Sequence, residues 1–340
     1  MTPVAAVTIF LAVLSPFAVW YLWERGKRYT ELMPGGLHED VTLPYEAEFE
    51  LYHNALSLCS KKMRICLDEL AIPYEGHHID LIETGSYENI GADYLAVNPG
   101  GILPVLVHNG HPVYESHDQI RYAAANAPEG SPQLVPADPE LEKEMHRWVD
   151  KASLLGDNPL ETARESAGGA APGLTVPLFA AMIDKISYRS IFEGLLFHRM
   201  RERPMVFIVL KTVGLERLHK IKPVMRVVQS CLKYMHRHLD ELEEHLTTTE
   251  GPWLLGETYS LADVSWIVLF ERLRETDYDH VFWGNGKRPL LEAYWQRLRE
   301  RPSYVRAITA HNHSTIDRGL TRLRETKQRL PALRQALEEN

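Results

Sequence analysis

Polar and apolar residues alternate over residues 48–53, EFELYH, as they do in a strand with one buried face. The next periodic run, SKKMRICLDEL at 60–70, has the spacing of a helix, and its apolar side chains share one face: Met63, Ile65, Cys66 and Leu70. Ile72-Pro73 ends that helix, and YEGHHIDL at 74–81 predicts a second strand. Strand, helix and strand in this order begin a β-α-β unit.

A hairpin is predicted next. Two short apolar runs, VLV and PVYE, flank His108-Asn109-Gly110-His111, and an Asn-Gly pair between apolar runs is a strong hairpin signal. Ser116 is placed to cap a helix after the second strand. Residues 48–127 therefore predict a small α/β domain.

The rest of the chain has mostly helical periodicity. Residues 128–140, PEGSPQLVPADPE, have the composition of a domain linker. Helical spacing is clearest at 138–155, 215–247, 260–275 and 288–300. Ser260 and Asp263 have the spacing of a capping box. We expect an all-helical domain at 138–310 and a helical tail at 311–340.

An extra segment at about 157–210 interrupts the helical domain. Residues 157–174 are rich in Gly, Ala and Pro and predict a loop. Residues 175–210 mix apolar groups with a basic strip, and their apolar run PMVFIVL is too short to span a bilayer. We expect that part to pack into the core or to mediate self-association, with a helix lying in a membrane interface as the alternative.

The amino-terminal segment is apolar. Residues 4–23 carry no charge and would span roughly 30 Å as a helix, enough to cross a bilayer. A secretory signal peptide would need a basic start and a small-residue cleavage site, whereas no Lys or Arg precedes this run. Aromatic residues close it and basic residues follow: Trp20, Tyr21 and Trp23, then Arg25, Lys27 and Arg28. We therefore expect a single-pass transmembrane anchor at 1–24, a linker at 25–47, and catalytic domains facing the cytoplasm.

Charge and cysteine content narrow the function. With 37 basic and 46 acidic residues the net charge is −9, which argues against binding nucleic acid through the overall field. Three cysteines among 340 residues cannot build a disulfide framework, and their spacing suggests no zinc site. We therefore predict no nucleic-acid partner and no metal.

Three separated segments resemble the glutathione S-transferase superfamily over residues 48–308. They are LYHNALSLCSKKMRICL, ILPVL with VYESHDQIRYAA, and PWLLGETYSLADVSWIVLFERL. The first is similar to the zeta class (maleylacetoacetate isomerase) and to the tetrachlorohydroquinone reductive dehalogenases. The resemblance implies a thioredoxin-like α/β domain followed by an all-α domain, glutathione as co-substrate and a homodimer. The predicted anchor, the segment at 157–210 and the tail lie outside it.

The resemblance also implies a glutathione site. Pro104 would be a cis-proline, and the backbone of Leu103 would pair with the cysteinyl part of glutathione. Glu115 would bind the γ-glutamyl ammonium, and Ser116 the α-carboxylate at a helix amino terminus, which favours anions. Ile102 departs from the family pattern, which often has Gln or Lys there for the glycyl end. Either Lys61 or Lys62 meets that end, or glutathione binds more weakly.

Ser57 and Cys59 are the candidate catalytic residues. Both stand where the first helix of the domain begins, and a thiolate is stabilised at a helix amino terminus. Ser57 would donate a hydrogen bond to the glutathione thiolate. Cys59 would either polarise an isomerase site or attack an aryl–glutathione conjugate, and the alternative is a buried apolar residue. For Cys66 and Cys231 we expect that buried role.

The sequence thus predicts a membrane-anchored, glutathione-dependent transferase. Its electrophile would be an apolar conjugated or halogenated aromatic compound, and one candidate reaction is reductive dehalogenation through a Cys59–glutathione mixed disulfide. One alternative is a zeta-like cis-trans isomerase or thiol transferase. Another is a non-catalytic glutathione-transferase-like interaction module.

Overall fold

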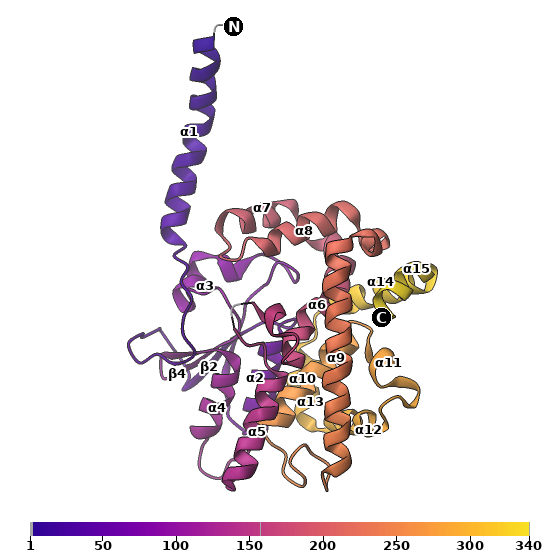
Figure 1. The fold of residues 1–340 in the computed structure, drawn as a ribbon. Coiled ribbons are helices and arrows are strands. Elements are labelled where there is room, and N and C mark those ends of the chain that lie inside the picture. Colours follow the sequence, from indigo (N-terminus) through magenta and orange to yellow (C-terminus); the bar gives the residue numbers. More distant parts are fainter. Residues whose placement is uncertain (1–2, 157, 340) are drawn as a thin grey trace.

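A computed structural model describes residues 3–156 and 158–339 of the chain. Its amino-terminal domain, in which Figure 1 labels β2 and β4, is built on a five-stranded sheet of order β1-β5-β4-β2-β3. The strands are β1 (Gly36–Leu37), β2 (Phe49–His53), β3 (Glu75–His78), β4 (Val105–His108) and β5 (His111–Tyr114). The helices of this domain are α2 (Leu58–Glu69), α3 (Ala92–Val97) and α4 (Ser116–Ala125), with a 3₁₀ turn at Glu88–Ile90.

The predicted β-α-β unit and hairpin are confirmed. β2 and β3 pair in parallel, whereas β4 pairs antiparallel with both β2 and β5. In the hairpin turn Asn109 has φ 50° and Gly110 has φ 84°. A two-residue hairpin turn of this hand needs positive φ at both positions, which Asn and Gly adopt at low cost. The turn sequence therefore sets the register of the β4–β5 pair.

The carboxy-terminal domain is helical. It contains α5 (Pro139–Ala152), α6 (Ala167–Met182), α7 (Tyr188–Phe197), α8 (Glu202–Val213), α9 (Lys222–Thr248), α10 (Leu261–Glu275), α11 (Asp279–Phe282), α12 (Pro289–Glu300), α13 (Pro302–Ala307), α14 (Ser314–Arg329) and α15 (Pro331–Glu338). Short 3₁₀ turns lie at Pro159–Thr162, Ile183–Lys185, Leu215–Lys220, Gly284–Gly286 and Thr309–His311. The predicted thioredoxin-like domain followed by an all-α domain is confirmed.

Helix α10 forms the centre of the helical domain. Its capping box is formed as predicted, with Ser260 N donating to Asp263 Oδ2 at 2.8 Å and the Ser260 side chain bonded to the first turn. Most of its residues are buried, and it packs against α5 and also against α2 of the other domain. Because α2 also carries Ser57 and Cys59 at its start, this packing fixes the candidate catalytic residues against the helical domain.

The loop predicted for residues 157–174 is wrong from Ala167 onward, where α6 begins. The glycines of this helix allow close packing that a loop pattern does not reveal. A Cβ added at Gly173 would lie 2.4 Å from Cys231 Sγ, and one added at Gly168 would lie 2.1 Å from the Ser153 carbonyl oxygen. Small residues therefore let α6 enter the core, where a larger side chain would clash.

The predicted transmembrane anchor is also wrong. Residues 4–23 belong to α1 (Pro3–Lys27), but among the residues that the structure describes no helix has both the length and the apolar character to cross a bilayer. Trp20 and Tyr21, read from the sequence as a membrane-interface belt, instead pack on Phe197 of α7 with ring centroids 5.9 and 5.8 Å apart. The prediction of a single-pass membrane protein with its domains facing the cytoplasm depended on this anchor, so that prediction is wrong as well.

Helices α7 and α8 lie side by side near the lower end of α1 (Figure 1). They come from the segment whose role the sequence left open. Phe197 and Phe207 are buried in a cluster with Ile82 and Tyr87 of the α/β domain. The expectation that part of residues 175–210 packs into the core is therefore confirmed.

Candidate active site

The turn before α2 is held by hydrogen bonds. Asn54 Nδ2 donates to the Ile79 carbonyl at 2.8 Å, and Asn54 Oδ1 accepts from Leu56 N at 2.8 Å. Ser57 is the N-cap, and its Oγ accepts from Ser60 N at 3.1 Å. Because a hydroxyl that accepts a hydrogen bond keeps its own proton, Ser57 can still donate to a thiolate beyond the helix end.

Cys59 lies in the first turn of α2, is partly buried, and lines a cavity that also contains Leu103, Pro104 and Glu115. The other two thiols are buried in the core. Burial raises the pKa of the Cys66 thiol well above its usual range and that of Cys231 to about 11. Cys59 therefore lines the cavity, whereas Cys66 and Cys231 have the buried role expected of them.

Lys62 follows Cys59 by one helical turn and is fully buried. Its Nζ donates to the Ser153 hydroxyl at 2.8 Å. Burial lowers the pKa of Lys62, and negative charge on Cys59 is the largest of the influences that oppose this lowering. Lys62 therefore lies close enough to Cys59 for the two side chains to interact electrostatically.

The loop before β4 contains the predicted cis-proline. The Leu103–Pro104 peptide bond is cis. The Pro104 carbonyl accepts from Gln119 Nε2 at 2.9 Å, and the same amide donates to the Val113 carbonyl at 2.8 Å. Gln119 is fully buried, so it ties this loop to β5 and α4.

Glu115 and Ser116 stand where β5 passes into α4. Glu115 is the N-cap and has φ 63°, in the left-handed region that residues other than Gly seldom adopt. Ser116, predicted as the cap, is instead the first helical residue and is buried. The first-turn N–H groups of α4 and the Ser116 hydroxyl together form a site suited to a carboxylate.

One cavity brings together five of the six predicted site residues: Cys59, Leu103, Pro104, Glu115 and Ser116. Ser57 lies two residues before Cys59, at the N-cap of the same helix. These residues come from three separate places in the chain, at α2, before β4 and at the start of α4. Their geometry offers backbone, carboxylate and helix-terminus partners for a peptide beside a free thiol.

Several residues of the cavity wall were not predicted as site residues, and two of them come from an unexpected part of the chain. Leu32 and Met33, in the segment predicted as a linker, line the cavity together with Ile102. The one local signal was an apolar pair directly before Pro34-Gly35, within a stretch that otherwise reads as a turn.

Lys61 and Lys62, the two lysines predicted to meet the glycyl end of glutathione, have other partners in the structure. Lys61 is buried and its ammonium is paired with Glu275 of α10. Lys62 is directed to Ser153 at the end of α5. Neither of the two lysines proposed for that end is therefore free to reach it.

Comparisons with known proteins agree with this geometry. The glutathione S-transferase N-terminal domain matches residues 56–126, and the glutathione S-transferase C-terminal domain matches residues 225–325. The chain belongs to the glutathione S-transferase superfamily. Like its relatives, it is an enzyme that uses glutathione as co-substrate.

Among curated relatives of this transferase are two reductive dehalogenases. The tetrachloro-p-hydroquinone reductive dehalogenase of Sphingobium chlorophenolicum is 26% identical over 279 residues, 78% of this chain and 97% of that one. The 2,5-dichlorohydroquinone reductive dechlorinase of Sphingobium indicum is 25% identical over 319 residues, 81% of this chain and 86% of that one. The beta-etherase LigF of Sphingobium sp. strain SYK-6 shares the fold, with a TM-score of 0.63 at 20% identity over 78% of this chain and 100% of that one.

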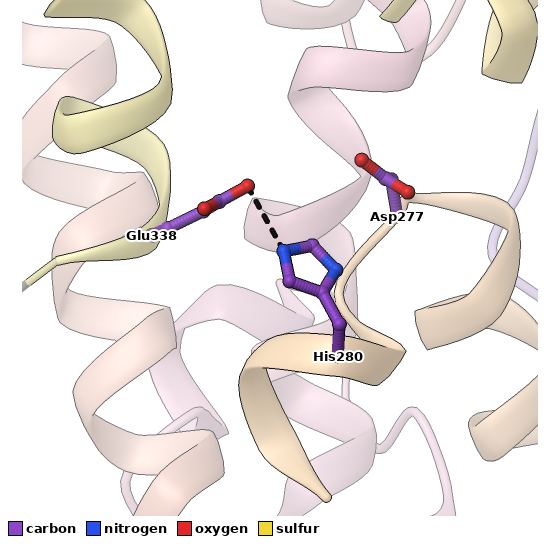
Figure 2. Close-up of side chains that lie close together, drawn as sticks. All are labelled: Asp277, His280 and Glu338. Carbon is purple, nitrogen blue, oxygen red and sulfur yellow. Dashed lines mark ion pairs between the residues drawn. The ribbon is translucent and has the colours of Figure 1, made fainter. Parts of the chain in front are cut away.

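The transferase has a second cluster of titratable groups, formed by Asp277, His280 and Glu338 (Figure 2). Their ligand atoms lie close enough for a metal ion, but the Lys327 ammonium is 2.6 Å from Asp277 and 2.5 Å from Glu338. His280 Nε2 is 3.2 Å from Glu338. These cations already balance the two carboxylates, so the cluster is best described as an ion-pair network that fastens α15 to the helical domain.

Proposed function

We propose that this transferase reductively removes a substituent, such as a halogen, from an apolar aromatic electrophile of the hydroquinone type. The observation that carries the proposal is the placement of Cys59 in the cavity that also holds the cis-proline loop, Glu115 and Ser116. A protein thiol within reach of bound glutathione allows chemistry that a serine alone does not. Two relatives named as reductive dehalogenases support this choice of substrate class.

The reaction proceeds in three steps. The glutathione thiolate, hydrogen-bonded by Ser57, displaces the substituent, which leaves as halide, and an aryl–glutathione thioether forms. The Cys59 thiolate attacks the sulfur of this thioether, the carbon–sulfur bond breaks, and the ring carbon takes a proton. The product is the reduced arene, and Cys59 is left in a disulfide with glutathione.

A second glutathione completes the cycle. It attacks the mixed disulfide, which frees Cys59 and forms glutathione disulfide. Two thiols are oxidised to one disulfide while the carbon–halogen bond is replaced by a carbon–hydrogen bond. Each turnover therefore consumes two molecules of glutathione and releases one halide.

Substrate recognition would combine polar and apolar surfaces. Glu115 and Ser116 hold the γ-glutamyl group, and the Leu103 backbone pairs with the cysteinyl part of glutathione. Ile102, next to Leu103, adds an apolar side chain to the cavity wall. The family's homodimer stays a prediction that size-exclusion chromatography with light scattering can test.

The test is product stoichiometry with a chlorinated hydroquinone and glutathione. We expect one chloride, one reduced hydroquinone and one glutathione disulfide per turnover, and we expect Cys59→Ser to stop at the aryl–glutathione conjugate. Conjugate as the end product of the wild-type enzyme would indicate a simple transferase. Isomerisation of a conjugated cis double bond that survives in Cys59→Ser would favour the zeta-like isomerase instead.

A further inference from the structure

The segment of the chain that leads into β1 lines the active-site cavity. We call residues 29–37 the strap. Near its start, Glu31 N donates to the Pro99 carbonyl at 3.0 Å, and at its end β1 pairs with β5, with Gly36 opposite Tyr114. Between these two attachments lie Leu32 and Met33, which line the cavity.

The strap leaves little room in the cavity. The remaining volume is about 30 Å³, on the scale of one or two water molecules. A tripeptide such as glutathione is many times larger. A tripeptide could therefore fill this cavity only if part of the cavity lining moved, and Leu32 and Met33 belong to that lining.

The strap also passes closely over the γ-glutamyl end of the site. A Cβ added at Gly35 would lie 2.2 Å from Asp118 Oδ2 and 3.2 Å from Glu115 Cβ. The absence of a side chain at Gly35 is what permits this approach. The strap thus lies against Glu115, the residue that would bind the ammonium of glutathione.

Few hydrogen bonds and little apolar packing hold the strap on the rest of the domain. Leu32 is 41% exposed. Met33 is partly buried and packs against a cluster that includes Leu103 and Tyr114. β1 is two residues long and contributes few backbone hydrogen bonds to the sheet. Local opening of such a segment costs far less than global unfolding.

We propose that the strap and glutathione compete for one cavity, so that Leu32 and Met33 set the affinity of this enzyme for its thiol. The inference rests on the proposed function, since it assigns glutathione to this cavity. In the closed form the strap shields Cys59, and in the open form glutathione takes its place. The apparent dissociation constant then equals the intrinsic one divided by the fraction of molecules with an open strap.

Truncating the two side chains should therefore tighten glutathione binding. In the double variant Leu32→Ala/Met33→Ala the closed form loses its packing and the cavity widens. We expect the dissociation constant for glutathione, measured by calorimetry, to fall by about fivefold or more. Leu37→Ala is the matched control, because Leu37 belongs to the same strap but does not line the cavity, and it should bind like the wild type.

Hydrogen exchange of the wild-type protein shows whether glutathione displaces the strap or is covered by it. Adding glutathione should speed amide exchange within residues 31–37, because displacement breaks the Glu31 and β1 hydrogen bonds. Slower or unchanged exchange in a protein that binds glutathione would overturn competition and make the strap a wall or cover for the ligand. Equal or weaker binding by the double variant would overturn it as well.

The outcomes separate this inference from the proposed function. Equal glutathione affinity in the wild type, the double variant and Leu37→Ala would remove the strap inference and leave the proposed function intact. Binding by all three proteins, tightest in the double variant and equal in the wild type and Leu37→Ala, would support both. No binding by any of the three proteins would overturn both at once. A thermal melt of each protein shows that the variants are folded.

Discussion

At the scale of single residues, the site depends on what surrounds one thiol. Ser57 caps α2 and can still donate a proton, while Lys62 is buried one turn beyond Cys59. Three short motifs that resemble the glutathione S-transferase superfamily suggested Ser57, Cys59, Glu115 and Ser116 as site residues, and each of these residues stands at or beside the start of a helix. They could not predict Lys62, because its burial depends on Ser153 from a distant helix.

Removing the positive charge of Lys62 should slow the reaction of Cys59 with iodoacetamide. We expect Lys62→Met to react roughly tenfold more slowly near neutral pH, because the variant removes a basic group one helical turn from the thiol. Lys62→Arg, which keeps the charge, is the control. Peptide mass spectrometry separates Cys59 from the two core cysteines. Equal rates in the Met and Arg variants would show that the charge of Lys62 does not act on Cys59.

The hydroxyl of Ser57 should matter for the glutathione thiolate. We expect Ser57→Ala to lower the rate of conjugation by roughly 10- to 100-fold, as for loss of a hydrogen bond to a charged group. Ser57→Thr keeps both the hydroxyl and the helix cap and should stay within a few-fold of the wild type. Similar losses in the Ala and Thr variants would point to the shape of the turn rather than to the hydrogen bond.

At the scale of helices and strands, the spacing of apolar residues and the residues typical of turns predicted most of the fold. Strands β2 to β5, helices α2, α4, α5, α9, α10 and α12, and the capping box of α10 follow from local sequence. The strand β1 could not be predicted, since two residues carry no period and gain their structure from pairing with β5. The helix α6 was missed because its glycines favour a loop in the sequence, and only the structure shows that they pack closely against other helices. The helix α1 was assigned to a membrane because the sequence does not reveal its aromatic contacts with α7.

Close packing of α6 makes Gly173 a sensitive position. We expect Gly173→Ala to lower the free energy of unfolding by about 1–3 kcal/mol, because the new methyl group would press on Cys231. The control is Gly26→Ala in α1, where an added Cβ has no neighbour within 4 Å. Urea unfolding measures both variants. A neutral effect at Gly173 would mean that α6 and α9 separate without cost.

At the scale of the whole molecule, ion pairs of Glu338 with His280 and Lys327 attach the last helix, α15, to the helical domain. Hydrogen bonds to Asp279 and Glu338 raise the pKa of His280 to about 9. Burial opposes ionisation of Glu338, but His280 and Lys327 outweigh it and lower the pKa of Glu338 to about 2. Stability from His280 is complete below its ordinary pKa of 6.5 and is lost as pH rises through 9. Stability from Glu338 is complete above its ordinary pKa of 4.5 and is lost as pH falls toward 2.

Breaking this network should weaken the alkaline sensitivity of the fold. We expect the melting temperature of Glu338→Gln to lie below that of the wild type at pH 7 and to fall less between pH 7 and pH 10, because His280 keeps Asp279 but has lost Glu338 as a partner. The neighbouring Glu339→Gln, at an exposed position, should behave like the wild type. Parallel pH profiles in Glu338→Gln and the wild type would show that the network does not hold α15.

The central claim is that Cys59 becomes covalently joined to glutathione during turnover. The most direct measurement is the intact mass of the protein after rapid acid quench of a reaction with glutathione and a chlorinated hydroquinone, with Cys59→Ser treated in parallel. We predict an added mass of roughly 305 Da, one glutathione held by a disulfide, that requires both the substrate and Cys59. Substrate turnover with no such adduct at any quench time would contradict the account.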